Sequence, residues 1–328
     1  MTAPLSKHPS FRIFPCADSL KDMISKNLAT LIGFSAILQW SSIVGLLKKI
    51  SFSIGADLAV LLMYSISTVI LLLLFKIPNL KLISKQYLIF STLLFVVYEL
   101  CFSYAIALAQ TAKQAIEVSL VNYLWPSLTV VMLIIFKEIK FNFFVLVGLA
   151  ISLTGIVVIQ MGQGTFSWSN IINNVQANPV IYILAFFGAS LWALYCVITK
   201  KYSDGHNPIS FFFLAISLVL WAKYLFSNSF SLQNIPHFDS TTIVLLGIVS
   251  LVVALGYAAW NIGIIKGNIT ILVTLSYFSP VISTVISMFI LDTQLSHAFW
   301  TGVLLVTTGS FVCWISTNWQ QIRAKLVG

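Results

Sequence analysis

Apolar runs of about 20 residues recur along the whole chain, and they restrict its fold more than any other feature of the sequence. A run of this length crosses the hydrocarbon core of a bilayer as an α-helix. Ten runs are bounded by Lys, Pro, Gly or Asn, and we predict membrane spans at 28–47, 58–75, 87–109, 114–136, 143–161, 179–199, 208–226, 241–263, 269–291 and 297–317. The predicted fold class is therefore all-α and integral to the membrane, with ten transmembrane helices.

Composition supports a membrane protein and excludes several other classes. Only 8% of the 328 residues are charged and 59% are hydrophobic, whereas soluble domains have about 25% and roughly 45–50%. So few charges cannot cover a water-soluble fold, which excludes secreted, disordered and ordinary cytosolic proteins. The net charge of +9 comes from Lys and Arg scattered over short loops. We therefore expect a lipid bilayer as a partner and no nucleic acid.

The same basic residues predict the topology, because cytoplasmic loops carry an excess of Lys and Arg. With a cytoplasmic N-terminus, fourteen Lys and Arg fall in inner segments, against Lys48, Lys49 and Lys113 in outer ones, with Lys223 unassigned. We expect a cytoplasmic tail at 1–26, five helices in 27–161, a periplasmic (outer) connecting loop at 162–178, five helices in 179–317 and a cytoplasmic tail at 318–328. Residues 1–26 lack the apolar stretch of a cleavable signal peptide.

The two groups of five helices resemble each other. Positions 154 apart match in identity or charge, namely Tyr277 with Tyr123, Pro280 with Pro126, Asp292 with Glu138, Gly302 with Gly148 and Gly309 with Gly155. At an offset of 152, Trp192 falls on Trp40. Because five is an odd number, the second group begins on the opposite side of the membrane, which makes an inverted repeat. Such repeats build alternating-access transporters with a substrate site near the bilayer midplane.

Several motifs carry a resemblance to a known family. They are QAIEVSLVNYLWPSLT at Gln114–Thr129, LWALYC at Leu191–Cys196, YAAWNIGIIKGNITI at Tyr257–Ile271 and SYFSPV at Ser276–Val281. With them the chain resembles the aromatic amino-acid exporter (YddG-type) family of the drug/metabolite transporter (EamA-like) superfamily. The resemblance implies a carrier in the bacterial inner membrane that exports Phe, Tyr, Trp and related amino acids. We expect it to be a monomer or a weak homodimer.

Residues near the middle of the predicted spans are candidates for substrate binding. A carboxylate at the depth of Glu99 needs a partner, water or a cavity, so Glu99 is either a titrating group and counter-ion for the substrate ammonium or a structural carboxyl bonded to a neighbouring helix. Its counterpart 154 residues later is Val253. Aromatic side chains at mid-depth suit stacking against a substrate ring. The predicted substrate-binding residues are Trp40, Tyr98, Glu99, Asn122, Tyr123, Trp125, Trp192, Tyr195, Ser276 and Tyr277.

Other residues are candidates for gating and helix bending. Lys113 and Glu117 lie four apart, which favours a local ion pair, the alternative being an outer gate. Tyr257, Trp260 and Asn261 lie toward the inner end of their span and suit an inner gate. Pro126 and Pro280 each remove a backbone hydrogen bond in mid-span, which favours a bendable patch at the midplane. The matched glycine pairs, each seven residues apart, predict close helix packing.

The sequence offers nothing for catalysis. It lacks the nucleotide-binding P-loop and the H-E-x-x-H and G-x-S-x-G motifs, and its cysteines and histidines have no metal-ligand spacing. We expect neither an enzyme nor a metal or other cofactor. Two alternatives to amino-acid export remain open: efflux of cationic aromatic drugs such as viologens, with Glu99 neutralising the charge, and a lipid scramblase or other protein acting on lipid-linked substrates.

Overall fold

Helices contain nearly all of the residues that the computed structural model describes, which are 25–137, 141, 143–160, 172, 175–203, 206–226, 238–267, 272 and 275–327. The helices are α1 (Lys26–Ile54), α2 (Ala56–Phe75), the short η2 (Leu80–Leu82), α3 (Lys85–Ala107), α4 (Ala112–Asn122), α5 (Trp125–Ile135), α6 (Phe143–Gln160), α8 (Pro179–Tyr202), α9 (Ile209–Phe226), α10 (Ser240–Lys266), α12 (Ser279–Leu291) and α13 (His297–Val327). The predicted all-α class is confirmed. The expected tail at 1–26 lies almost wholly outside the described residues, as does most of the loop at 162–178.

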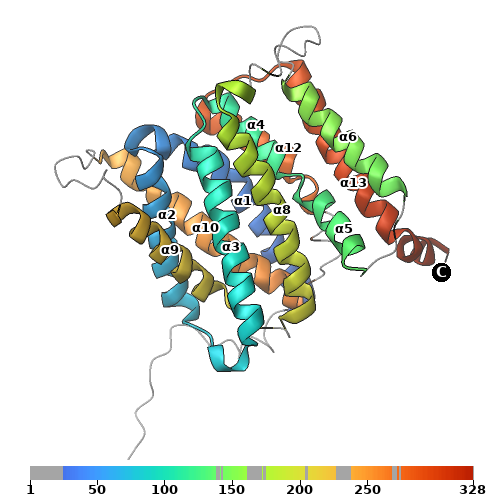
Figure 1. Cartoon of the computed structure of the whole chain (residues 1–328), viewed down its shortest axis with the longest axis horizontal. Coiled ribbons are helices and arrows are strands. Elements are labelled where there is room, and N and C mark those ends of the chain that lie inside the picture. Colours follow the sequence, from blue (N-terminus) through green and yellow to red (C-terminus); the bar gives the residue numbers. More distant parts are fainter. Residues whose placement is uncertain are drawn as a thin grey trace, which may run out of the picture.

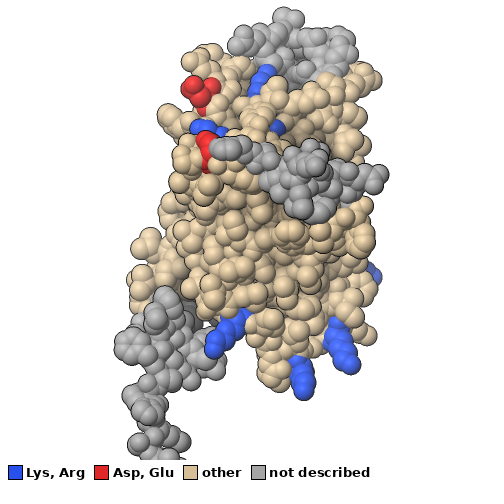
Figure 2. All heavy atoms as spheres, turned by 90° about the vertical axis from the view of Figure 1, so that its left-hand side faces the viewer, with Lys and Arg blue, Asp and Glu red and all other residues tan. Residues whose placement is uncertain are grey.

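Eight segments of the described chain are long and apolar enough to cross a membrane, with α4 and α5 together forming one of them. Two further apolar helices, Phe143–Ile159 and Ser279–Leu291, are shorter than that threshold. Figure 2 shows a broad band without charged side chains, and Lys and Arg side chains project from the lower end of the molecule below it. The chain therefore has the surface expected of a multi-pass membrane protein.

Helix α1 is longer than predicted, because Lys48 and Lys49 extend the helix instead of starting an outer loop. Lys48 is 3% exposed and its Nζ donates to the carbonyl oxygens of Ala107, at 3.0 Å, and Ala109. These carbonyls end α3, where a cation is favourable. The helix stops only at Gly55, whose φ of 83° is left-handed and turns the chain into α2.

The main helix pairs join the first and second halves of the chain. Helix α1 packs on α10, α3 on α8, α2 on α9 and α6 on α13. In Figure 1 the α6–α13 pair lies on one side of the remaining helices, next to α5 and α12. Every pair combines one helix from before residue 161 with one from after residue 178, so the two halves interlock instead of forming separate domains.

Glycines allow α6 and α13 to approach closely. A Cβ placed on Gly155 would lie 2.7 Å from the carbonyl oxygen of Gly302, and one on Gly148 would lie 2.6 Å from that of Gly309. Neither contact is possible for a larger residue without movement of the backbone, so the predicted role of these glycines in close packing is confirmed. The contacts are reciprocal, since the earlier glycine of one helix faces the later glycine of the other.

The fourth predicted span is interrupted at its centre. Helix α4 ends at Asn122 and α5 begins at Trp125, with Pro126 as its second residue, where a missing N–H costs little. The amide of Leu124 turns back to the carbonyl of Val121 at 3.2 Å instead of continuing the helix. Pro280 has the same place at the start of α12. The interruption presents Asn122, Tyr123 and Trp125 to the middle of the helix bundle.

Lys223, which the charge pattern left unassigned, is paired with Asp57 across α9 and α2. The hydroxyl of Tyr104 donates to the same carboxylate at 2.7 Å and lies 3.1 Å from Lys223 Nζ. This ion pair therefore joins three helices at the end of the molecule where α1 turns into α2.

Candidate functional site

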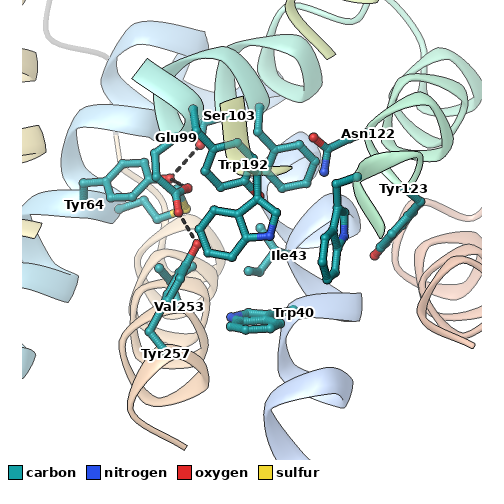
Figure 3. A pocket seen from close by; sticks show the side chains of 14 residues that line it. Trp40, Ile43, Tyr64, Glu99, Ser103, Asn122, Tyr123, Trp192, Val253 and Tyr257 are labelled. Atoms are coloured by element: carbon teal, nitrogen blue, oxygen red, sulfur yellow. Dashed lines mark hydrogen bonds between the residues drawn. The ribbon is translucent and has the colours of Figure 1, made fainter. Parts of the chain in front are cut away.

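A central cavity lies between the helices of both halves and is partly open to solvent. Figure 3 shows the side chains around it. Its lining comes from α1, α2, α3, the α4–α5 interruption, α8 and α10, and consists of Trp40, Ile43, Met63, Tyr64, Tyr98, Glu99, Phe102, Ser103, Asn122, Tyr123, Trp125, Trp192, Val253 and Tyr257. Aromatic side chains predominate, with a single carboxylate among them.

Glu99 is 3% exposed, and both of its carboxylate oxygens accept hydrogen bonds from tyrosines. The hydroxyl of Tyr64 donates to one oxygen and that of Tyr257 to the other, as the dashed lines in Figure 3 show for this cluster. Ser103 Oγ lies 2.9 Å from the Tyr64 hydroxyl. No Lys or Arg belongs to the described lining, so the carboxyl group has hydrogen bonds but no cation beside it.

Aromatic rings form a continuous wall around Trp192. Its centroid lies 4.6 Å from that of Tyr98 and 6.3 Å from that of Trp125, with the second pair edge to face at 87°. Behind it, Tyr195 stacks at 4.9 Å and 21° without lining the cavity. Such tilted and offset arrangements leave ring faces that can accept another aromatic ring.

Asn122 provides the polar group farther along the cavity. It is 3% exposed, and its Oδ1 is buried without a hydrogen-bond partner. A buried amide oxygen left unpaired costs free energy, and this one lines the cavity. In Figure 3 Asn122 and Glu99 lie on different sides of the cavity, with Trp192 between them. The two polar groups therefore flank an aromatic centre.

The structure brings together most of the predicted substrate-binding residues and leaves out three. Those that line the cavity are Trp40, Tyr98, Glu99, Asn122, Tyr123, Trp125 and Trp192. Tyr195 supports Trp192 from behind, and Ser276 and Tyr277 do not reach the lining. The Tyr277 ring packs against Phe311 and Trp314 of α13, with centroids 6.4 and 6.3 Å apart. Its counterpart in the repeat, Tyr123, faces the cavity instead.

The residues expected at the gates are dispersed. Tyr257 belongs to the cavity and bonds Glu99, while Trp260 packs on the far side of Trp40 with centroids 5.1 Å apart. The side chain of Asn261 lies outside the described part of the structure.

At the start of α4, Lys113 Nζ is 3.8 Å from Glu117, which also accepts a hydrogen bond of 2.9 Å from Tyr182 of α8. This is the local ion pair that the spacing favoured, with an additional link to the second half of the chain.

Sequence reasoning missed six lining residues: Ile43, Met63, Tyr64, Phe102, Ser103 and Val253. Tyr64 is the most important of them, because it holds Glu99. Tyr64 lies near the middle of α2, and its aromatic ring carries a polar hydroxyl group. A polar aromatic ring near mid-span was the criterion that selected Tyr98, so the same criterion would have selected Tyr64. The apolar residues carry no such signal.

Among the described residues no group of three His, Cys, Asp or Glu side chains is placed to hold a metal ion. What the cavity can do is bind an aromatic molecule with a polar or cationic end.

Comparisons with known proteins agree with this geometry. Residues 179–315 match the model of the EamA-like transporter family. The aromatic amino acid exporter YddG of Escherichia coli (strain K12) is 40% identical over 297 residues, covering 90% of this chain and 99% of the relative. The YddG protein of Salmonella typhimurium (strain 14028s / SGSC 2262), also described as an aromatic amino acid exporter, is 40% identical over 290 residues, covering 88% and 98%. A solved crystal structure with 22% identity shares the fold at a TM-score of 0.61, over 88% of this chain and 97% of the other.

Proposed function

The chain belongs to the EamA-like transporter family, and from this premise we propose that it exports aromatic amino acids across the bacterial inner membrane by alternating access. It is a multi-pass membrane transporter and not an enzyme. The two exporters that it matches over nearly their whole length support the substrate class. The observation that carries the proposal is the cavity itself, in which an aromatic wall and one uncompensated carboxylate lie together.

The aromatic wall supplies the affinity for the substrate ring. Trp192 lines the cavity beside Tyr98 and Trp125. Each aromatic pair contributes about 0.5–1.5 kcal/mol beyond the burial of its area. A contact of this kind with the substrate distinguishes a phenyl or indole ring from an aliphatic side chain of similar polarity.

Glu99 and Asn122 supply the affinity for the amino-acid end. Glu99 attracts the substrate ammonium, because no cation lines the described cavity to neutralise it. The amide of Asn122, with its unpartnered oxygen, contacts the same polar end from the other side of the ring. In this role Glu99 is a counter-ion, and Tyr64 and Tyr257 hold it in place.

Ten spans in two inverted five-helix repeats, with both termini in the cytoplasm, form the architecture of the proposed carrier. The helix pairs support it, since α1 on α10 corresponds to α3 on α8 when the halves are exchanged. Trp40 with Trp192, and Glu99 with Val253, are repeat counterparts that line one cavity. The cavity forms within one chain, which supports transport by a monomer. The interruptions before Pro126 and Pro280 provide the bending that alternating access requires.

Counterflow in proteoliposomes tests the proposal. Radiolabelled tryptophan and phenylalanine should exchange, and threonine should exchange less. Trp192→Ala should raise the KM for both aromatic substrates by about two- to tenfold, because the substrate ring loses one stacking contact with the wall. Trp319→Ala is the matched control, since that ring is 54% exposed and outside the cavity. Absence of aromatic exchange by the wild type would refute the proposal.

One observation favours a second substrate class. A carboxylate without a neighbouring cation also suits a cationic aromatic drug such as a viologen. The same liposomes decide between them: viologen uptake without amino-acid exchange would assign the cavity to drug efflux.

A further inference from the structure

Gly256 of α10 lies directly against the indole of Trp40. A Cβ on this glycine would lie 2.9 Å from Trp40 Nε1 and 3.0 Å from its Cδ1. Ordinary van der Waals contact begins at 3.4 Å, so any other residue at 256 would have to displace the ring by about 0.5 Å. The indole of Trp40 therefore fits against α10 at this position because Gly256 has no side chain.

The Trp40 ring has little freedom to move elsewhere. Tyr257 lies 5.2 Å and Trp260 5.1 Å from it, centroid to centroid. Its Nε1–H is buried and has no hydrogen-bond partner, so packing and not a hydrogen bond sets its position. Because Tyr257 and Trp260 confine the ring and Trp40 lines the cavity, we expect a side chain at 256 to shift the ring toward the cavity.

We propose that Gly256 sets the width of the cavity and thereby allows an indole-sized substrate. It is a positioning residue that acts through Trp40 without touching the substrate. This inference rests on the proposed function, because it concerns the size of aromatic ring that the cavity accepts. A methyl group at 256 should exclude tryptophan more strongly than phenylalanine.

Gly256→Ala provides the test, measured as KM for counterflow of tryptophan and phenylalanine in the same liposomes. We expect the KM for tryptophan to rise about tenfold and that for phenylalanine to rise less than about threefold, as one methylene of lost space discriminates by roughly this amount. Gly247→Ala on the same helix is the matched control, because a Cβ there meets nothing within 4 Å. An equal change for both substrates, or no change, would overturn the inference.

A double variant separates the ring contact from a general effect on α10. Trp40→Ala removes the whole indole, including Nε1 and Cδ1, the two atoms nearest to Gly256, so adding Gly256→Ala to it should leave the tryptophan-to-phenylalanine ratio of Trp40→Ala unchanged. If the single variant Gly256→Ala does not fold but the double variant does, the result supports the contact between residue 256 and Trp40. If neither variant folds, the inference is overturned. Wild-type protein that exchanges neither substrate contradicts the proposed function instead, so the two failures are distinguishable.

Discussion

Replacing Glu99 by glutamine removes the one negative charge in the cavity lining while preserving shape. The structure predicts that the protein tolerates the change. An amide oxygen can accept from Tyr257, and the amide nitrogen can donate to the Tyr64 hydroxyl oxygen, because that hydroxyl can turn toward Ser103 at 2.9 Å. The hydrogen bonds are therefore rearranged and not lost, and we expect thermal unfolding in detergent to change little.

Substrate binding should change far more. A hydrogen bond to a charged group contributes about 1.5–3 kcal/mol, and the ammonium loses this contribution in Glu99→Gln. At about 1.4 kcal/mol for each factor of ten, the KM for tryptophan should rise between tenfold and a hundredfold. A ligand without an ammonium group should not lose affinity.

The assay is competition of tryptophan counterflow by indole-3-propionate, which is tryptophan without its ammonium. In wild type the analogue should compete weakly, and in Glu99→Gln it should compete as well as tryptophan or better. Asp239→Asn controls for loss of a carboxylate, because Asp239 is an exposed N-cap of α10 and asparagine caps equally well. An unchanged ratio between the two ligands would refute the assignment of Glu99 as counter-ion and leave it as a structural carboxyl.

Three further predictions concern stability. Gly155→Ala should lower the free energy of unfolding by about 1–3 kcal/mol, because its Cβ would meet a backbone oxygen at 2.7 Å, whereas Gly247→Ala should leave the thermal midpoint unchanged. Lys48→Met should cost about 1–3 kcal/mol in the same assay, because the carbonyls ending α3 lose their buried donor. Hydrogen bonds from Thr242 lower the pKa of Asp239 below its ordinary 3.8. The ionised cap therefore stabilises α10 above that pH, and this stabilisation is lost as the pH falls through the lower pKa. The protection factor of the Thr242 amide, which is its intrinsic exchange rate at each pH divided by the observed rate, should therefore fall in acid, and Asp239→Asn should abolish this dependence.

The sequence was sufficient for features that depend on depth in the membrane. Apolar run length predicts the spans, and Glu99 and Trp192 were selected because a polar or aromatic side chain at mid-depth requires a partner. Both line the cavity. Pro126 likewise predicts a defect in a span, and the helix is interrupted there.

Orientation around each helix axis could not be predicted in the same way. In α2 nearly every residue is apolar, so nothing distinguishes Met63, which faces the cavity, from Leu73, which is 77% exposed on the outside. Tyr277, a predicted binding residue, matches Tyr123 in the sequence repeat, but its ring packs against Phe311 and Trp314 of α13 and does not line the cavity. Sequence repeats conserve the path of the backbone better than the chemistry of a site.

Glu99 and its counterpart in the proposed repeat, Val253, both line the cavity, so the two proposed halves differ in charge at the site. If the two halves exchange conformations when the carrier changes from inward-facing to outward-facing, the backbone around the ligand is much the same in both states. The two ends of a zwitterion carry opposite charges. A cavity with two equal carboxylates would let the ligand bind in either direction, or would hold two cations. Val253 has an isopropyl group where a second carboxylate would lie. The ammonium end of the ligand therefore stays beside Glu99 while the protein changes conformation around it. In the proposed carrier, Glu99 and Val253 together would therefore fix which end of the ligand each half of the protein faces.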